Sequence, residues 1–308
     1  MKSIMYHYVR EFDAKHPNFR FLDVKNFKKQ LDYFKDNFGF VSKEEWGQFI
    51  NSGKLPDKKG KVLLTFDDAM RCNYDYVYPE LMKRGLWGIF YVPVLPYQQQ
   101  KLLDVHRIHL LCGAFAGEDL FREAMTLITD EMISDSKKKE FKEKTYINQI
   151  NYVSVTEFKR LLNYYISYNY RETFIDSLGE VFSYRFDASK FYVQKEELQQ
   201  MFNDGMIIGS HGVSHPIMSK LSELEQRKQI VSSFTTLENF GVIGQKTYCH
   251  PYGGFHSFNH NTVTLLIEEG VSYSFNVEAR DIEAKDCLQS IQFLPRYNCN
   301  LFEHGKAS

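Results

Sequence analysis

The sequence predicts an α/β fold built on a parallel, barrel-like sheet. Apolar runs typical of buried strands, such as 62–64 and 87–92, alternate with stretches of helical period. Strand, helix and strand in this order indicate parallel β-α-β units. A chain of 308 residues is large for one domain but within the range of a barrel-like α/β domain. We therefore expect a single domain over 1–308.

The composition argues against several classes of function. The 38 basic and 39 acidic residues give a net charge of −1, so nothing indicates a nucleic-acid or anionic-membrane partner. No apolar run approaches the roughly 18 residues of a transmembrane helix, and the first residues lack the apolar segment of a signal peptide. Five cysteines, an odd number without zinc-ribbon spacing, favour a reducing compartment. We expect a cytoplasmic protein without a transmembrane segment; the oligomeric state is not indicated.

The N-terminal third predicts three strands and three helices. The first strand covers the N-terminal residues, with His7 near its end. Asp23 is the expected N-cap of a helix with apolar residues at helical period, and Ser42 opens a second helix through a capping box with Glu45. The strand that starts at Val62 follows, and then come a helix around 78–84 and the strand 87–92.

Beyond residue 98 the pattern changes. Strand signals almost vanish over 98–192, while helical stretches follow one another at 102–111, 119–133, 155–166 and 171–182. We expect a helical insertion there. The α/β pattern resumes with a helix over 194–203, a strand near 206–209, a long helix opened by the capping box of Ser222 and Glu225, and a strand over 246–249.

Two adjacent carboxylates end the strand that starts at Val62. Asp67 and Asp68 stand where the chain turns from strand to loop, so both side chains can reach the same edge of the sheet. Burying two carboxylates together is unfavourable unless a cation or proton offsets them. A helix N-cap followed by a solvated acid is the commoner fate of an Asp-Asp pair. One metal ligand beside one general base is the functional alternative, and it needs histidines elsewhere.

Two histidines follow another predicted strand. His211 and His215 are four residues apart, a spacing that places both on one face of a helical turn. Pro216 disfavours helical geometry at His215, so we expect a loop or one irregular turn. Imidazole and carboxylate suit a zinc-like divalent ion, and three protein ligands leave one position open for water.

Three motifs together resemble those of the NodB-type polysaccharide deacetylases, carbohydrate esterase family 4. They are Thr65-Phe66-Asp67-Asp68, the pair His211-x-x-x-His215, and His250-Pro251-Tyr252-Gly253, in the same order along the chain. The resemblance covers roughly 1–95 and 193–300. It implies a distorted, open (β/α) barrel, here with the helical insertion about 98–192 between the Asp-Asp and histidine motifs.

The resemblance also implies roles for individual residues. Asp68, His211 and His215 would hold one divalent metal, Zn in the first place, with Ni, Co and Fe as alternatives. Asp67 would be the general base, and the backbone amide of Tyr252 would donate to the oxyanion.

Two further assignments depend on one branch of the family, the exopolysaccharide N-deacetylases. Tyr6-His7-Tyr8-Val9 resembles a segment whose histidine is the general acid in that branch; a partly buried structural histidine is an equal alternative for His7. Many family members have an arginine where this chain has Cys249. Arg296, in a Leu-Pro-Arg element similar to one of the same branch, would replace that arginine and orient Asp67. His256 and His260 remain spare candidates for the acid.

The sequence thus predicts a metal-dependent hydrolase acting on linear amides. It would remove acetyl groups from an N- or O-acetylated sugar or glycan intermediate of surface-polysaccharide biosynthesis, such as capsule or lipopolysaccharide. The alternative is a non-catalytic sugar-binding or scaffold protein on a degenerate deacetylase fold, which the arginine missing at Cys249 favours and the intact Asp and His motifs oppose. A hydrolase for another amide or ester is also open, and the motifs leave the sugar, its linkage and the native metal undetermined.

Overall fold

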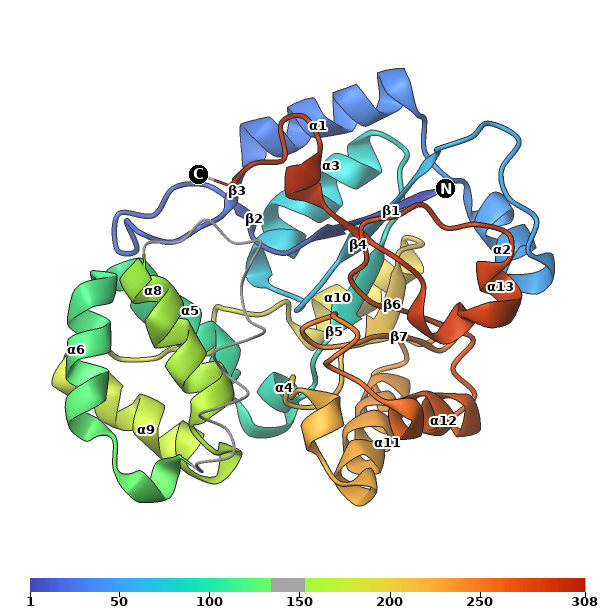
Figure 1. Cartoon of the computed structure of the whole chain (residues 1–308). Helices are drawn as coiled ribbons and strands as arrows, with labels where there is room; N and C mark the ends of the chain where they lie inside the picture. Colours follow the sequence, from blue (N-terminus) through green and yellow to red (C-terminus); the bar gives the residue numbers. More distant parts are fainter. Residues whose placement is uncertain (134–152, 308) are drawn as a thin grey trace. The chain divides into compact units, whose positions relative to one another are not determined.

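The fold is described from a computed structural model, which describes residues 1–133 and 153–307 (Figure 1). The chain divides into two compact units. The first unit comprises Met1–Glu11, Phe21–Lys101 and Ser189–Ser308, and the second comprises Phe12–Arg20 and Leu102–Ala188. Most of the expected insertion, 98–192, belongs to the second unit, and 134–152 lie outside the described residues. A single domain interrupted by an insertion stays a prediction.

The first unit is built on a seven-stranded sheet in which every pair of neighbouring strands is parallel. Parallel neighbours end at the same edge, so the residues that follow these strands gather there. From one edge to the other the order is β8 (Tyr273–Phe275), β7 (Thr247–Cys249), β6 (Ile207–Ser210), β5 (Ile89–Val92), β4 (Val62–Phe66), β1 (Lys2–Tyr6) and β9 (Tyr297–Asn298).

One short segment joins the two edges of this sheet. Leu294 forms a parallel bridge with Phe275 of β8, and a few residues later Tyr297 of β9 pairs with Ile4 of β1. The sheet therefore curls, because its two outer strands contact the same stretch of chain. This confirms the predicted distorted, open (β/α) barrel.

Helices pack against both faces of the sheet, and each face has its own hydrophobic core. Leu64 and Phe66 point to the core that α1 (Val24–Asn37), α3 (Tyr78–Lys83) and α10 (Lys195–Asn203) bury. Leu63 points to a second core, where it meets Trp46 of α2 (Lys43–Ser52). Side chains of a strand alternate between faces, so Asp67, directly after β4, falls on the face of Leu63.

The local signals of the sequence place most helix starts correctly. Asp23 caps α1 by accepting a hydrogen bond from the Lys25 amide, and the capping boxes of Ser42 and Ser222 open α2 and α11 (Glu223–Asn239). Several elements were not predicted from the sequence, namely the π-helix Asn73–Val77, α4 (Leu95–Gln99), α12 (His260–Glu268), β8 and α13 (Asp286–Gln289).

The second unit is helical where the structure describes it. It contains α5 (Asp104–Ala114), α6 (Gly117–Leu127), α8 (Val153–Arg160), the π-helix Leu161–Tyr165 and α9 (Tyr168–Val181). Their apolar faces form one core around Leu111, Leu120 and Phe158. The helical character predicted for this part of the chain is confirmed over the described residues.

Across 1–133 and 153–307, no helix combines the length and the apolar character needed to cross a bilayer.

Candidate metal and active site

The register of β1 and β4 brings the first motif together. Tyr6 pairs with Phe66, the last residues of the two strands, and the amide of Asp67 donates to the carbonyl of Tyr6 at 3.0 Å. His7 and Asp67 therefore leave neighbouring strands at the same level. His7 and Asp67 are sixty positions apart in the sequence, and they can act on the same molecule only because β1 and β4 are neighbours.

Asp67 and Asp68 diverge because the backbone turns sharply between them. Asp68 and the following Ala69 both adopt left-handed conformations, with φ of 74° and 48°. Such residues cost of order 1–3 kcal/mol each and persist only when the surrounding structure holds them. Both carboxylates are buried, with 1% of Asp67 and 4% of Asp68 exposed. The turn sends two adjacent acids to two different sets of partners.

The partners of Asp68 are the two histidines. Its Oδ1 lies 3.6 Å from Nε2 of His211 and 3.7 Å from Nε2 of His215, and both imidazoles are buried. As Pro216 predicts, the histidine segment is a loop, and His215 has a φ of 57°. One carboxylate oxygen and two imidazole nitrogens therefore face one point.

This donor set fits a divalent metal. Tetrahedral ligands about 2.1 Å from an ion lie about 3.4 Å apart, close to the separations within the triad. His211 Nδ1 is 2.8 Å from the carbonyl of Cys249, so it carries the proton and leaves the Nε2 lone pair toward Asp68. Burial lowers the pKa of His211, which keeps the imidazole in the neutral form that binds metals. Asp68, His211 and His215 form a possible metal site.

A second group, Asp67, His211 and Cys249, also has its ligand atoms close together, but these atoms are poorly suited to bind a metal. A thiol binds metals as a thiolate, whereas burial raises the pKa of Cys249 well above its ordinary value. Arg296 also lies among these groups, with Nη2 at 2.9 Å from Cys249 Sγ. A guanidinium in this place repels a second cation. Of the two groups, the triad of Asp68 is therefore the one whose donors fit a metal ion.

Asp67 is paired with Arg296. Two parallel hydrogen bonds join them, Nη1 to Oδ1 at 2.7 Å and Nη2 to Oδ2 at 2.9 Å. Arg296 is held by Thr65 Oγ1 and by the carbonyl of Asn276, both at 3.1 Å. It is 1% exposed, so Arg296 is not a surface residue. Thr65 and Asn276 were not predicted as its supports, because only the fold brings them to the guanidinium.

The arginine decides the charge of Asp67. Burial by itself raises the pKa of this carboxyl, but the charge and hydrogen bonds of Arg296, together with the imidazoles of His211 and His7, outweigh burial, and the net pKa lies below its ordinary value. Asp67 is therefore ionised at neutral pH, where an acceptor for a proton must be.

His7 lies on the open side of Asp67. Its Nε2 is 3.8 Å from Asp67 Oδ2, beyond a direct hydrogen bond, and 38% of its side chain is exposed. A half-exposed imidazole beside the carboxylate can reach both an incoming molecule and water. His256 and His260 follow the Tyr252 turn and are exposed at the surface.

The turn of the third motif lies against the triad. The ring of Tyr252 packs on His215 with centroids 5.0 Å apart, and Tyr252 has a φ of 63°. A Cβ on Gly253 would lie 2.2 Å from Val277 Cγ2, so this tight turn requires glycine. His250 points away: its Nε2 is 2.8 Å from the Gln292 carbonyl, and burial lowers its pKa to about 4.

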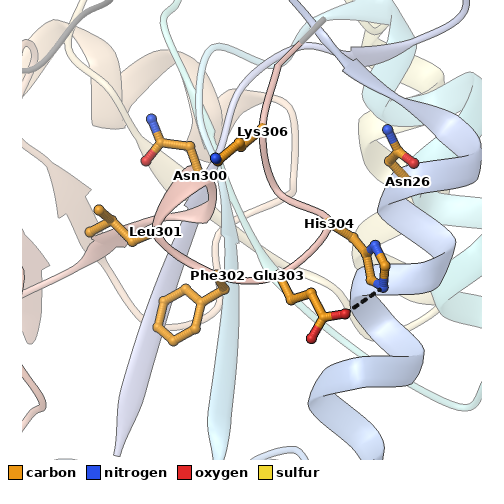
Figure 2. Close-up of a pocket in the computed structure, with 7 residues that line it drawn as sticks. All are labelled: Asn26, Asn300, Leu301, Phe302, Glu303, His304 and Lys306. Atoms are coloured by element: carbon orange, nitrogen blue, oxygen red, sulfur yellow. Dashed lines mark ion pairs between the residues drawn. The ribbon is translucent and has the colours of Figure 1, made fainter.

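A separate pocket lies between α1 and the C-terminal segment. Figure 2 shows its lining residues, Asn26, Asn300, Leu301, Phe302, Glu303, His304 and Lys306. His304 Nε2 pairs with Glu303 Oε1 at 3.3 Å. None of these residues belongs to the triad, so this pocket is separate from the candidate metal site.

Solved structures with the same fold are known. The chain is similar to the deacetylase PplD of Streptococcus pyogenes, solved in complex with acetate, with 16% identity, a TM-score of 0.59, and coverage of 97% of this chain and 91% of PplD. A de-N-acetylase from Aggregatibacter actinomycetemcomitans has 14% identity and a TM-score of 0.52, with coverage of 96% and 93%. IcaB from Ammonifex degensii has 15% identity and a TM-score of 0.51, with coverage of 89% and 82%. At such identities the likeness shows a shared fold.

The sequence itself matches one family model. Residues 140–274 match the model of the polysaccharide deacetylases, a range that contains His211, His215 and the His250 motif and does not reach Asp67 and Asp68. No curated protein matches the chain. By the family model over 140–274 and by its fold, the chain is similar to the polysaccharide deacetylases.

Proposed function

We propose that the protein is a metal-dependent deacetylase acting on an N-acetylated sugar or glycan. The observation that carries this proposal is the division of the two acids: Asp68 faces two imidazoles, while Asp67 faces a guanidinium and His7. A divalent ion, Zn in the first place, held by Asp68, His211 and His215 would polarise the acetyl carbonyl and lower the pKa of its water.

The remaining roles belong to residues of the chain. Asp67, ionised and held by Arg296, takes the proton of the attacking water. The amide of Tyr252 donates to the developing oxyanion, an interaction worth about 2.7–4 kcal/mol when one such donor is removed from other hydrolases. His7 gives a proton to the leaving amine, which departs poorly without one.

The substrate class is proposed on the same basis. The exopolysaccharide branch supplies the segment that Tyr6-His7-Tyr8-Val9 resembles, and the fold is shared with a de-N-acetylase. An N-acetylated intermediate of surface-polysaccharide biosynthesis fits both. A non-catalytic sugar-binding protein is less well supported, because Arg296 pairs with Asp67 and lies beside Cys249, where it can supply the charge that a cysteine cannot.

The metal site is tested by metal analysis of the purified protein. We expect about one equivalent of divalent metal in the wild type and almost none in His211→Ala, since one of three ligands is lost. His260→Ala, which removes an exposed histidine, should keep the full equivalent. Equal occupancy in wild type and His211→Ala would contradict the site. Acetate release from an N-acetylated oligosaccharide by the metal-loaded protein separates the enzyme from a sugar-binding protein.

The general acid is tested by comparing two kinds of substrate. His7→Ala should reduce turnover of an amide by about 10²–10⁴-fold, because proton transfer to the leaving amine is lost. An activated ester, whose leaving group needs no proton, should be affected much less, and the metal content should not change.

His256→Ala is the matched variant for this comparison. It should leave the ratio of amide to ester turnover as in the wild type. If amide and ester turnover fall equally in His7→Ala, or if His256→Ala shows the selective loss, His7 is structural and the acid lies in the loop after Tyr252.

A further inference from the structure

The loop that carries the two histidines, 211–215, is supported from two sides. On one side the chain that follows β5 holds its carbonyl groups. The amides of Val94 and Leu95 donate to the carbonyls of Gly212 and Val213, at 3.1 and 2.9 Å. These bonds are made by backbone alone, so they do not depend on the identity of any side chain.

On the other side a single side chain of α11 holds the amides. Gln229 Oε1 accepts hydrogen bonds from the amides of Val213 and Ser214, both at 2.9 Å. Its Nε2 donates to Ser214 Oγ at 3.0 Å. Three hydrogen bonds of one glutamine thus end on Val213 and Ser214, two of the three residues between His211 and His215.

Two serine hydroxyl groups, that of Ser210 at the end of β6 and that of Ser233 on α11, support the start of the loop. The amide of Gly212 donates to Ser210 Oγ at 3.0 Å, and Ser210 Oγ lies 2.6 Å from Ser233 Oγ. Ser233 Oγ donates to the carbonyl of Ile230 at 2.7 Å. Because the hydroxyl proton of Ser233 is used there, Ser210 is the donor between the two serines.

The loop needs such support because its backbone is strained. Gly212 has a φ of 76° and His215 a φ of 57°, and the latter is unfavourable for a residue with a side chain. Two consecutive amides that share one acceptor fix the direction of the chain between these positions. If the acceptor is lost, the loop can relax and His215 can turn away from Asp68.

We propose that Gln229 is a positioning residue of the metal site. Its amide oxygen fixes Val213 and Ser214, and through them it fixes the left-handed conformation of His215 that brings Nε2 to Asp68. Gln229 contacts neither the metal triad nor Asp67, and it acts through the loop alone. The inference rests on the proposed function only in taking Asp68, His211 and His215 as the metal ligands.

The test compares two glutamines of α11. Gln229→Met keeps the length of the side chain and removes its hydrogen bonds, whereas Gln229→Glu keeps the acceptor. The control is Gln226→Met: Gln226 is buried on the same helix, accepts from Thr262 Oγ1 at 2.6 Å and donates to the Leu221 carbonyl at 3.1 Å, away from the loop. Two quantities are measured: the Kd for Zn²⁺ by competition with a chromophoric chelator, and amide hydrogen exchange of Val213 and Ser214 in metal-free protein.

In Gln229→Met we expect a Kd roughly 10–100-fold weaker, the usual effect of losing a group that orients a ligand, together with faster exchange of both amides. Gln229→Glu should restore most of the affinity and the protection. Gln226→Met should lower the Tm and leave the Kd and both amides unchanged.

Three outcomes would overturn the role of Gln229 and leave the metal site standing. They are weaker Zn²⁺ binding without faster amide exchange, faster exchange without weaker binding, and equal loss of affinity in Gln229→Met and Gln226→Met. Wild-type protein that binds no Zn²⁺ would instead overturn the metal site of the proposed function.

Discussion

Replacing Asp67 with Asn is expected to lower turnover by about 10²–10⁴-fold while the metal content stays near one equivalent. The amide of Asn cannot take a proton from water, but it has nearly the shape of the carboxylate and its oxygen still accepts from Arg296. Asp68 and the two histidines lie on the other side of the turn, so their ligand atoms do not move. Acetate release and metal content are measured on the same sample.

Asp68→Asn is the matched variant, since it alters the neighbouring acid by the same single atom. It should lose metal and activity together. If Asp67→Asn loses the metal while Asp68→Asn keeps it, the roles of the two acids are the reverse of those proposed.

Replacing Arg296 with Met is expected to lower the free energy of unfolding by about 3–5 kcal/mol, the usual cost of leaving one partner of a buried ion pair alone. Both groups are almost fully buried, with 1% of each exposed, so water cannot replace the lost guanidinium. Turnover should fall as well, because Asp67 loses the charge that keeps it ionised. Urea denaturation of wild type and variant gives the difference.

Two further variants show whether the loss comes from the stranded charge. The double variant Arg296→Met with Asp67→Asn should be more stable than Arg296→Met alone, because position 67 then carries no unpaired carboxylate. Arg71→Met breaks ion pairs with Asp75 and Glu197 that are partly exposed, and it should cost less than about 1 kcal/mol. If Arg71→Met and Arg296→Met cost the same, or if the double variant is the least stable, the pairing with Asp67 does not explain the effect.

The features that could be predicted from the sequence are those that depend on a few neighbouring residues. The helix starts at Asp23, Ser42 and Ser222 follow from side chains that satisfy the amides of the first turn, and Pro216 alone indicates that His215 lies outside a helix. The position of Asp67 and Asp68 after an apolar run was likewise visible, because strand and loop meet there.

Other features depend on distant parts of the chain. β8 has only three residues and is hydrogen-bonded to β7, so its run carries little signal of its own. The π-helix after Asp68 has no sequence period by which to recognise it. The ion pair of Asp67 with Arg296 came from the resemblance, and the residues do not indicate it by themselves. Gln229 could not be recognised from the sequence, because nothing local distinguishes this half-buried glutamine from a solvated residue of the same helix.

The pairing of Asp67 with Arg296 also bears on how the nascent chain folds. The two residues are 229 positions apart, so at about 5–20 residues per second the ribosome delivers the guanidinium roughly 10–50 s after the carboxylate. During that interval β1 and β4 can pair, but Asp67 must stay hydrated or protonated. The interior beside β4 therefore reaches its ion-paired form only after the Leu294–Arg296 segment joins β8, so the surroundings of Asp67 are completed late in biosynthesis.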